Sequence, residues 1–108
     1  MSEAEVLLAL ATFPEMETAK RIADILVRER LAACVNLFPA VESVYCWKDE
    51  VATSAEVAAW IKTTPGCYGA LEARYRALHP YEVPALVAIS VKAGLLEYCK
   101  WVAKSCGN

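Results

Sequence analysis

The single histidine, His79, lies in the segment His79-Pro80-Tyr81-Glu82-Val83-Pro84. Each proline disfavours helical backbone in the residue before it, so the segment is predicted to be a rigid loop. Imidazole and carboxylate groups suit divalent cations, which makes His79 a candidate metal ligand or general base. The alternative is a loop histidine that bonds only to backbone. A metal site here needs further ligands from elsewhere in the chain or from other subunits.

Glu56, Trp60 and Lys62 alternate along one predicted strand and therefore face the same way. They form either an exposed face of a sheet or the lining of a pocket between subunits. In such a pocket the glutamate and the lysine would pair with each other or with a small anion. We expect the following residues to meet in one cleft, partly across a subunit boundary: Glu56, Lys62, His79, Tyr81 and Glu82.

The cysteines are odd in number and have no C-x-x-C spacing: Cys34, Cys46, Cys67, Cys99 and Cys106. This pattern argues against a disulfide framework and against a zinc knuckle. Cys34, Cys46 and Cys99 fall at predicted core positions, so we interpret the thiols as reduced, small hydrophobic side chains. A cysteine enzyme with His79 as its base is disfavoured, and no glycine-rich phosphate loop is present. We therefore predict that the protein is not an enzyme.

Length and composition predict one domain over residues 1–108. Hydrophobic residues make up 57% of the chain and charged residues 22%, which is apolar for so small a monomer and predicts self-association. The net charge of −2 argues against nucleic acid and against a polybasic membrane patch. The longest uncharged run, residues 31–41, is too short to span a membrane, which takes about 18 residues. The acidic start, MSEAEV, does not resemble a signal peptide, so we expect a cytoplasmic protein.

Hydrophobic periodicity predicts four strands and three helices. The nearly continuous apolar run at 6–13 predicts a strand buried on both faces. Helices are predicted over 15–31 and 65–78, the second beginning at a Thr64-Pro65 cap. Further strands are predicted at 34–48 with a bend at Pro39, at 51–63 and at 85–91. A short helix should begin at Gly94 and turn these residues inward: Leu95, Tyr98, Cys99 and Val102.

This order is typical of an α+β, ferredoxin-like βαββαβ sandwich with an added C-terminal helix. The second and third strands, joined by a polar turn at 48–50, are much longer than the usual 5–6 residues. They should form a hairpin that projects beyond the sheet. A projecting two-stranded arm favours pairing with another chain.

Five segments resemble the CutA family of divalent-cation tolerance proteins. They are A-A-C-V-N-L-F-P (32–39), V-Y-C-W-K (44–48), E-V-A-A-W-I-K-T (56–63), H-P-Y-E-V-P (79–84) and Y-C-K-W-V (98–102). The resemblance covers nearly the whole chain. It implies a ferredoxin-like subunit in a homotrimer, similar in architecture to the PII signalling proteins.

The resemblance also implies a role in tolerance to divalent cations, with copper as the cation bound by some members. The family's copper site draws on a cysteine near the end of the first strand and on histidines at the H-P-Y loop. In this sequence Ala11 and Leu78 occupy two of those positions, so only His79 carries over. We therefore expect any copper binding to be weak.

Together these observations predict a cytoplasmic, homotrimeric CutA-like protein that serves as a binding or regulatory module, with a divalent cation such as copper as the implied ligand. One alternative is a PII-like sensor that binds a small anionic metabolite at the subunit clefts through Lys62 and Glu56. Another is a structural scaffold that presents a surface to a partner protein. Similarity of fold to the PII proteins does not by itself carry function.

Overall fold

A computed structural model describes residues 5–107. The first four residues of the acidic MSEAEV segment, on which the expectation about export depends, lie outside the described residues. The elements follow in the order β1 (Leu7–Phe13), α1 (Met16–Arg28), β2 (Cys34–Trp47), β3 (Glu50–Thr63), α2 (Pro65–Leu78), β4 (Leu86–Ser90) and α3 (Leu96–Ser105). None of the helices in this part of the chain is both long and apolar enough to cross a membrane.

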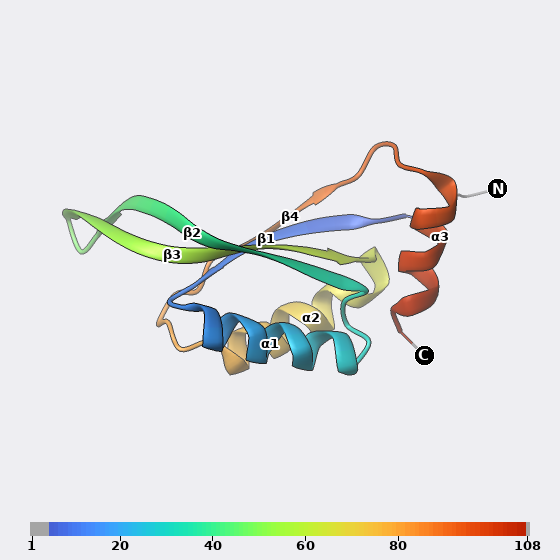
Figure 1. The fold of residues 1–108 in the computed structure, drawn as a ribbon, viewed down its shortest axis with the longest axis horizontal. Coiled ribbons are helices and arrows are strands. Elements are labelled where there is room, and N and C mark those ends of the chain that lie inside the picture. The colour runs from blue at the N-terminus through green and yellow to red at the C-terminus, as the bar shows by residue number, and fades with distance from the viewer. Residues whose placement is uncertain (1–4, 108) are drawn as a thin grey trace.

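The four strands form one antiparallel sheet in the order β2-β3-β1-β4. Helices α1 and α2 cover one face of this sheet, and α3 lies at the end opposite the hairpin (Figure 1). The predicted ferredoxin-like α+β fold is confirmed. The strand and helix bounds lie within a few residues of those predicted.

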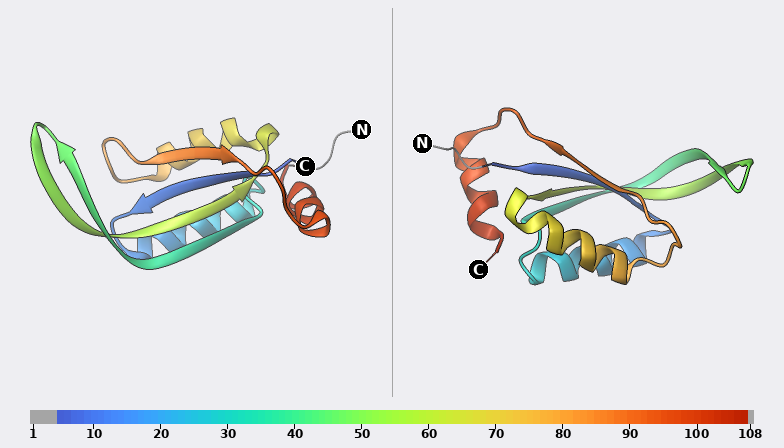
Figure 2. Two further views of the ribbon diagram at one scale, coloured as in Figure 1. Left: turned by 90° about the horizontal axis from the view of Figure 1, so that it is seen from above. Right: turned by 180° about the vertical axis from the view of Figure 1, so that it is seen from behind.

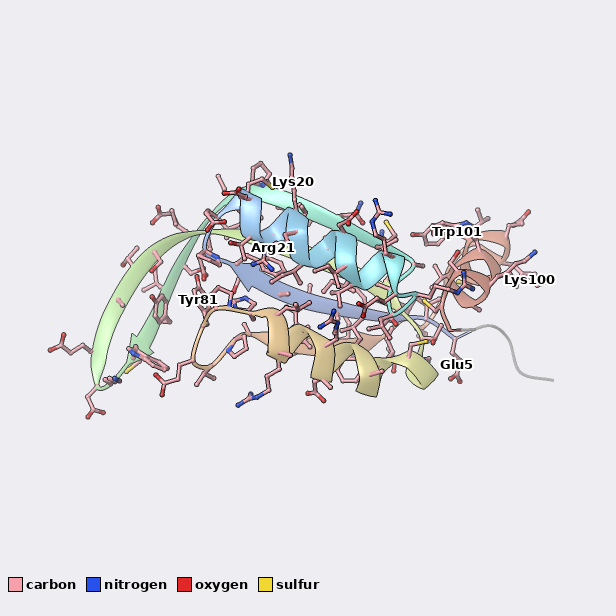
Figure 3. All side chains as sticks on the ribbon, turned by 90° about the horizontal axis from the view of Figure 1, so that it is seen from below. Glu5, Lys20, Arg21, Tyr81, Lys100 and Trp101 are labelled. Carbon is pink, nitrogen blue, oxygen red and sulfur yellow. The ribbon has the colours of Figure 1, made fainter. Side chains whose placement is uncertain are left out.

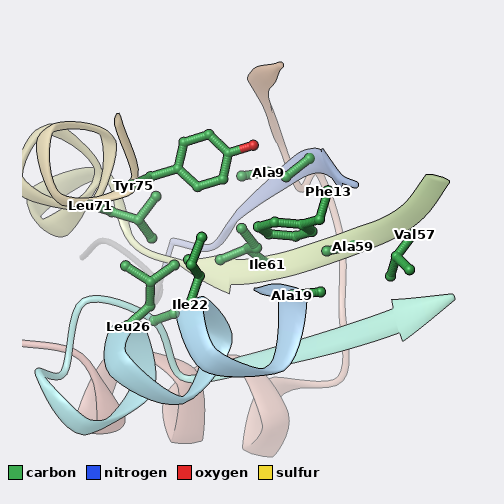
Figure 4. Close-up of a cluster of buried hydrophobic side chains, with 12 residues drawn as sticks. Ala9, Phe13, Ala19, Ile22, Leu26, Val57, Ala59, Ile61, Leu71 and Tyr75 are labelled. Atoms are coloured by element: carbon green, nitrogen blue, oxygen red, sulfur yellow. The ribbon is translucent and has the colours of Figure 1, made fainter. Parts of the chain in front are cut away.

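The core lies between the sheet and the two helices (Figure 4). Helix α1 presents Ala19, Ile22 and Leu26, each with no exposed surface, at the spacing of one helical face. Phe13, at the end of β1, packs edge-on against Tyr75 of α2, with ring centroids 5.9 Å apart. This side of the sheet is dry and closely packed.

The opposite face of the sheet, which we call the open face, has no helix over it in one subunit (Figure 2). Pairing of β1 with its neighbours places Leu10 between Trp60 and Val87, and Leu8 beside Ile89. Trp60 is 44% exposed and Ile89 is 52% exposed, whereas Leu8 and Leu10 are half-buried. The prediction that β1 is buried on both faces is therefore wrong for a single subunit, because nothing in that subunit covers this side.

The β2–β3 hairpin extends well beyond the rest of the sheet. Pairing of β1 with β3 stops at Phe13 and Val57, while β2 and β3 stay paired from Val41–Glu56 to Trp47–Glu50. We call residues 41–56 the arm. A register shift between Phe38 and Val41, at Pro39, bends the arm as it leaves the sheet, as Figure 2 shows.

The predicted turn at the tip of the arm has the expected backbone. Lys48 and Asp49 both have positive φ, at 53° and 69°. This combination gives a two-residue hairpin turn whose twist matches that of the strands. Aspartate tolerates the left-handed conformation, so Asp49 suits this position. Cys46, near the tip, is exposed, so its predicted core placement is wrong.

Helix α1 ends at Arg28, three residues before the predicted end. Arg30 takes a left-handed conformation with φ 62°, and the Leu31 amide donates to the carbonyl of Leu26. This is the C-terminal cap that glycine usually supplies. The Arg30 side chain donates to the backbone carbonyls of Lys104 and Gly107, which ties the end of α1 to the end of α3.

Helix α3 begins at Leu96 rather than at Gly94, and it buries less than predicted. Val102 is fully buried, whereas Leu95 is 71% exposed and Tyr98 is 38% exposed. The helix packs at the end of the sheet rather than over a face, so only a narrow part of the helix surface is buried. A Cβ at Gly94 would lie 2.9 Å from the Cys99 sulfur, so a larger residue there would require the Cys99 side chain to shift.

Candidate functional site

A half-open groove of about 500 Å³ lies at the root of the arm. It is bounded on one side by the arm and on the other by the loop at 79–85. Figure 3 shows Tyr81 at this position. The groove is lined by Thr12, Ser43, Tyr45, Trp47, Glu56, Tyr81, Glu82, Val83 and Ala85. Two carboxylates line it, and no lysine or arginine is among the described lining residues.

Glu56 and Tyr81 join the arm to the loop. The Tyr81 hydroxyl donates to Glu56 Oε2 at 2.7 Å, and Glu56 is only 9% exposed. Burial and the hydrogen bond to Glu56 raise the pKa of the Tyr81 phenol. The phenol therefore stays protonated at neutral pH and remains a donor to the buried carboxyl group.

His79 is buried against aromatic rings, and both of its ring nitrogens are engaged. Nε2 donates to the carbonyl of Thr12 at 2.8 Å, and Nδ1 accepts from the Tyr81 amide at 3.1 Å. The ring stacks on Phe13 with centroids 5.3 Å apart. This pattern assigns the proton to Nε2 of a neutral imidazole. A metal ion would have to displace one of these two bonds.

The far end of the loop is held by a second aromatic residue. The Tyr75 hydroxyl donates to the carbonyl of Ala85 at 2.6 Å, and burial raises the pKa of this phenol. Together His79 and Tyr75 fasten both ends of the proline-framed loop onto β1 and α2. The loop is thus a rigid platform that presents Tyr81 and Glu82 to the groove.

Lys62 lies apart from this groove, toward the other end of β3. Its ammonium group donates to Asn36 Oδ1 at 2.6 Å and lies 5.7 Å from the centre of the Tyr98 ring. Of the predicted cleft residues, Glu56, His79 and Tyr81 form a connected group within one subunit, and Glu82 lines the same groove. A meeting of Lys62 with them across a subunit boundary stays a prediction.

No cluster of three or more histidine, cysteine, aspartate or glutamate side chains with metal-binding geometry occurs within residues 5–107. Metal ligation by His79 therefore stays a prediction.

Sequence reasoning missed several groove residues. Tyr45 and Trp47 alternate along β2 and so share one face of that strand, but their position opposite the loop depends on the bend at Pro39. Thr12 acts through its backbone carbonyl, which leaves no signal in its side chain. Asn36 lies next to Lys62 because of the register between β2 and β3, which pairs Cys34 with Lys62.

Comparison with known proteins gives one consistent result. The family described as CutA1 divalent ion tolerance protein matches residues 7–105. The divalent-cation tolerance protein CutA of Thermus thermophilus is 44% identical over 98 residues, which cover 91% of this chain and 95% of that protein. The chloroplastic CutA 1 of Oryza sativa is 43% identical over 94 residues, covering 87% of this chain and 53% of that relative, so the match spans about half of the rice protein.

Solved structures agree with the sequence comparison. The crystal structure of CutA1 from Oryza sativa has a TM-score of 0.93 and 38% identity, covering 97% of this chain and 96% of that one. The Thermus thermophilus CutA1 structure has a TM-score of 0.92 and 42% identity, covering 94% of this chain and 99% of that one. The names of the family and of the Thermus thermophilus relative refer to divalent-ion or divalent-cation tolerance, and neither name states a catalytic activity. This chain belongs to the CutA family of divalent-ion tolerance proteins.

Proposed function

We propose that the protein is a non-enzymatic binding module in divalent-cation tolerance and that it works as a homotrimer. In this trimer a neighbouring subunit completes the acidic groove, and the groove takes up a divalent cation such as copper. The observation that carries the proposal is the pair of carboxylates, Glu56 and Glu82, in a half-open groove at the root of an arm whose two strands pair only with each other. Carboxylate oxygens are ligands that divalent cations accept.

The trimer is supported by apolar surface that one subunit leaves uncovered. Phe38 and Trp60 contact each other edge-on at 5.5 Å on the open face, where Phe38 is 40% exposed. On the arm, Val44 is 68% exposed and Val51 is 78% exposed. Monomeric proteins rarely leave so much contiguous apolar surface in water. A second and a third copy would cover the open face and brace the arm.

We expect copper binding through His79 to be weak, because both ring nitrogens already have hydrogen-bond partners. The imidazole has no free nitrogen, so coordination through Nδ1 must first break the bond from the Tyr81 amide. Ala11 and Leu78 supply no donor side chain. Any affinity has to come mainly from the carboxylates of Glu56 and Glu82, with His79 as a ligand that must be released from the loop.

A calorimetric titration with Cu²⁺ tests this proposal, using protein whose accessible thiols have been blocked. Wild-type protein should give a weak, saturable signal that Glu82→Gln and His79→Ala reduce. Glu50→Gln is the matched control, because Glu50 is an exposed glutamate near the tip of the arm and does not line the groove. A wild-type protein that binds no Cu²⁺, or binding that survives both groove substitutions, would contradict the proposal.

A second function is favoured by the surroundings of Lys62. Within residues 5–107 no carboxylate pairs with Lys62, and its ammonium group lies between Asn36 and the Tyr98 ring. A cation beside aromatic rings suits a small planar anion, as in a metabolite sensor. Binding of a nucleoside triphosphate that needs no divalent cation and disappears in Lys62→Ala would favour this function over cation capture.

We also place the protein in the cytoplasm. All five cysteines are free, which agrees with a reducing compartment. Cell fractionation of the host tests this placement, and recovery of the protein from an oxidising compartment would contradict it.

A further inference from the structure

Two thiols meet where the start of α2 and the end of α3 come together, far from the groove. Cys67 lies in the first turn of α2, and Cys106 follows the last residue of α3. Cys106 belongs to a small buried cluster with Val102 and Ala33, Cys67 packs against that cluster, and the pKa of the Cys106 thiol is raised by burial and by the nearby Cys67 thiol.

Backbone contacts around Arg30 hold this pair in place. The carbonyl of Arg30 accepts the Gly107 amide at 2.8 Å, and the Cys67 thiol lies 3.9 Å from the same oxygen. Gly107 has φ +79°, and a Cβ placed on it would lie 3.7 Å from the Cys67 sulfur. The residue after Cys106 therefore lies beside the Cys67 sulfur, which places the two cysteines next to each other where α2 begins and α3 ends.

The two thiols differ in accessibility. Cys106 is 9% exposed, and its burial raises the pKa of its thiol. Cys67 is the more exposed of the two, being half-buried in the first turn of α2. Cys67 is thus the thiol that meets an outside reagent first, and Cys106 is the thiol placed to react with it afterwards.

We propose that Cys67 and Cys106 form a reversible intramolecular disulfide that fastens α3 to the start of α2. The oxidant is a low-molecular-weight disulfide such as oxidised glutathione. The Cys67 thiolate attacks one sulfur of this disulfide and releases one glutathione thiol, which leaves a mixed disulfide on Cys67. The Cys106 thiol then loses its proton, attacks the Cys67 sulfur and releases the second glutathione. Two protein thiols are oxidised and one small disulfide is reduced to two thiols.

The bond would act on the least secured element of the fold. Helix α3 is held by the small cluster around Val102 and by the two bonds from Arg30. It carries Tyr98 and Trp101, whose rings stack with centroids 5.6 Å apart near Lys62. Fixing α3 would fix this aromatic pair. The proposal is independent of cation binding, because neither thiol lines the groove.

The test equilibrates the full chain in glutathione buffers of increasing oxidised fraction and then traps free thiols. Intact mass and non-reducing peptide mapping should reveal a Cys67–Cys106 link without bound glutathione. The oxidised protein should melt at a higher temperature, and amide hydrogen exchange in α3 should slow. Cys99→Ala is the matched control: Cys99 packs against the same cluster, but its sulfur lies against Gly94, so this variant should form the link normally.

Cys106→Ala should stop at a glutathione adduct on Cys67, and Cys67→Ala should give neither the link nor the adduct at Cys106. A wild-type protein that carries only mixed disulfides across the whole series would overturn the proposal. So would a link that involves Cys99, or a Cys67–Cys106 link that leaves hydrogen exchange in α3 unchanged. Because the peptide map of the wild type gives this information directly, the test does not depend on the variants folding.

Discussion

The two faces of the sheet differ in how much of their apolar surface is buried within one subunit. On the helix-covered face, Ala9, Phe13 and Ile61 are essentially without exposed surface, and each packs against α1 or α2. On the open face, Trp60, Val87 and Ile89 are half exposed, although Trp60 is the neighbour of Ile61 on β3 and the other two lie on β4, which pairs with β1. A core completed within one subunit fixes the fold, whereas a face left apolar and uncovered points to other copies of the chain. The arm continues the second pattern beyond the sheet.

The largest effect should come from the helix-covered face. Phe13 is 1% exposed and contacts both Tyr75 and His79. Phe13→Ala should lower the free energy of unfolding by about 3–5 kcal/mol, because it removes buried apolar surface and leaves a cavity. Chemical denaturation measures this change. Val51→Ala on the arm, where the side chain is 78% exposed, should change a separated subunit by less than about 0.5 kcal/mol.

A charge on the open face should break assembly rather than the fold. Trp60→Asp places a carboxylate where we expect neighbouring subunits to pack, so sedimentation should detect smaller species with a retained circular dichroism spectrum. Val27→Asp is the matched control, because Val27 is 39% exposed but lies on α1. If Trp60→Asp assembles as the wild type does, the open face is not where subunits pack against each other.

Removing the bond between the arm and the loop should have an intermediate effect. Tyr81→Phe leaves the buried carboxyl group of Glu56 without its donor. We expect a loss of about 1–3 kcal/mol in the free energy of unfolding, the cost of an unsatisfied buried group. Glu56→Gln, which keeps a carbonyl acceptor for the tyrosine, should lose less. Equal losses in both variants would contradict this explanation.

Alkaline pH should weaken the same region. The pKa values of Tyr75 and Tyr81 are raised in the folded protein, mainly by burial. Below about pH 10 both states keep the phenol protons, so the stability that these two groups contribute does not change with pH. Above that pH only the unfolded chain loses them, and stability should fall as pH rises. Denaturation midpoints between pH 9 and pH 11 measure this fall, which Tyr81→Phe should reduce; a flat profile would contradict it.

The smallest effect belongs to the outer surface of the helices. Arg74 of α2 pairs with Glu29 through two bonds of 2.8 Å, but both side chains are about two-fifths exposed. Arg74→Ala should lower the free energy of unfolding by about 0–1 kcal/mol, because solvent screens the pair. Denaturation at low and high salt measures this. A larger loss would contradict the expectation that this exposed ion pair adds little to the free energy of unfolding.

The sequence predicted best what depends on local chemistry. The Thr64-Pro65 pair predicted the start of α2, and the polar residues at 48–50 predicted the hairpin turn, which the structure forms at Lys48 and Asp49 with Glu50 already in β3. It predicted poorly what depends on tertiary placement. The end of α1 was missed because Arg30 takes a conformation that usually signals glycine, and it is held there by contacts with the distant end of α3.

The same distinction holds for the candidate site. The loop predicted from its prolines does bring His79 and Tyr81 beside Glu56. Strand alternation put Lys62 on the same side as Glu56, but alternation carries no information about position along the strand, and the two groups lie apart in one subunit. The engagement of both His79 nitrogens could not be read from the sequence, because one partner is the backbone carbonyl of Thr12.

The mass of the particle in solution tests the central claim, that the open face and the arm are completed by other copies of this chain. Multi-angle light scattering of the reduced protein at low micromolar concentration measures it directly. We expect a single species of three times 11.8 kDa, with no covalent link between subunits. A stable, folded species of 11.8 kDa under these conditions would contradict it.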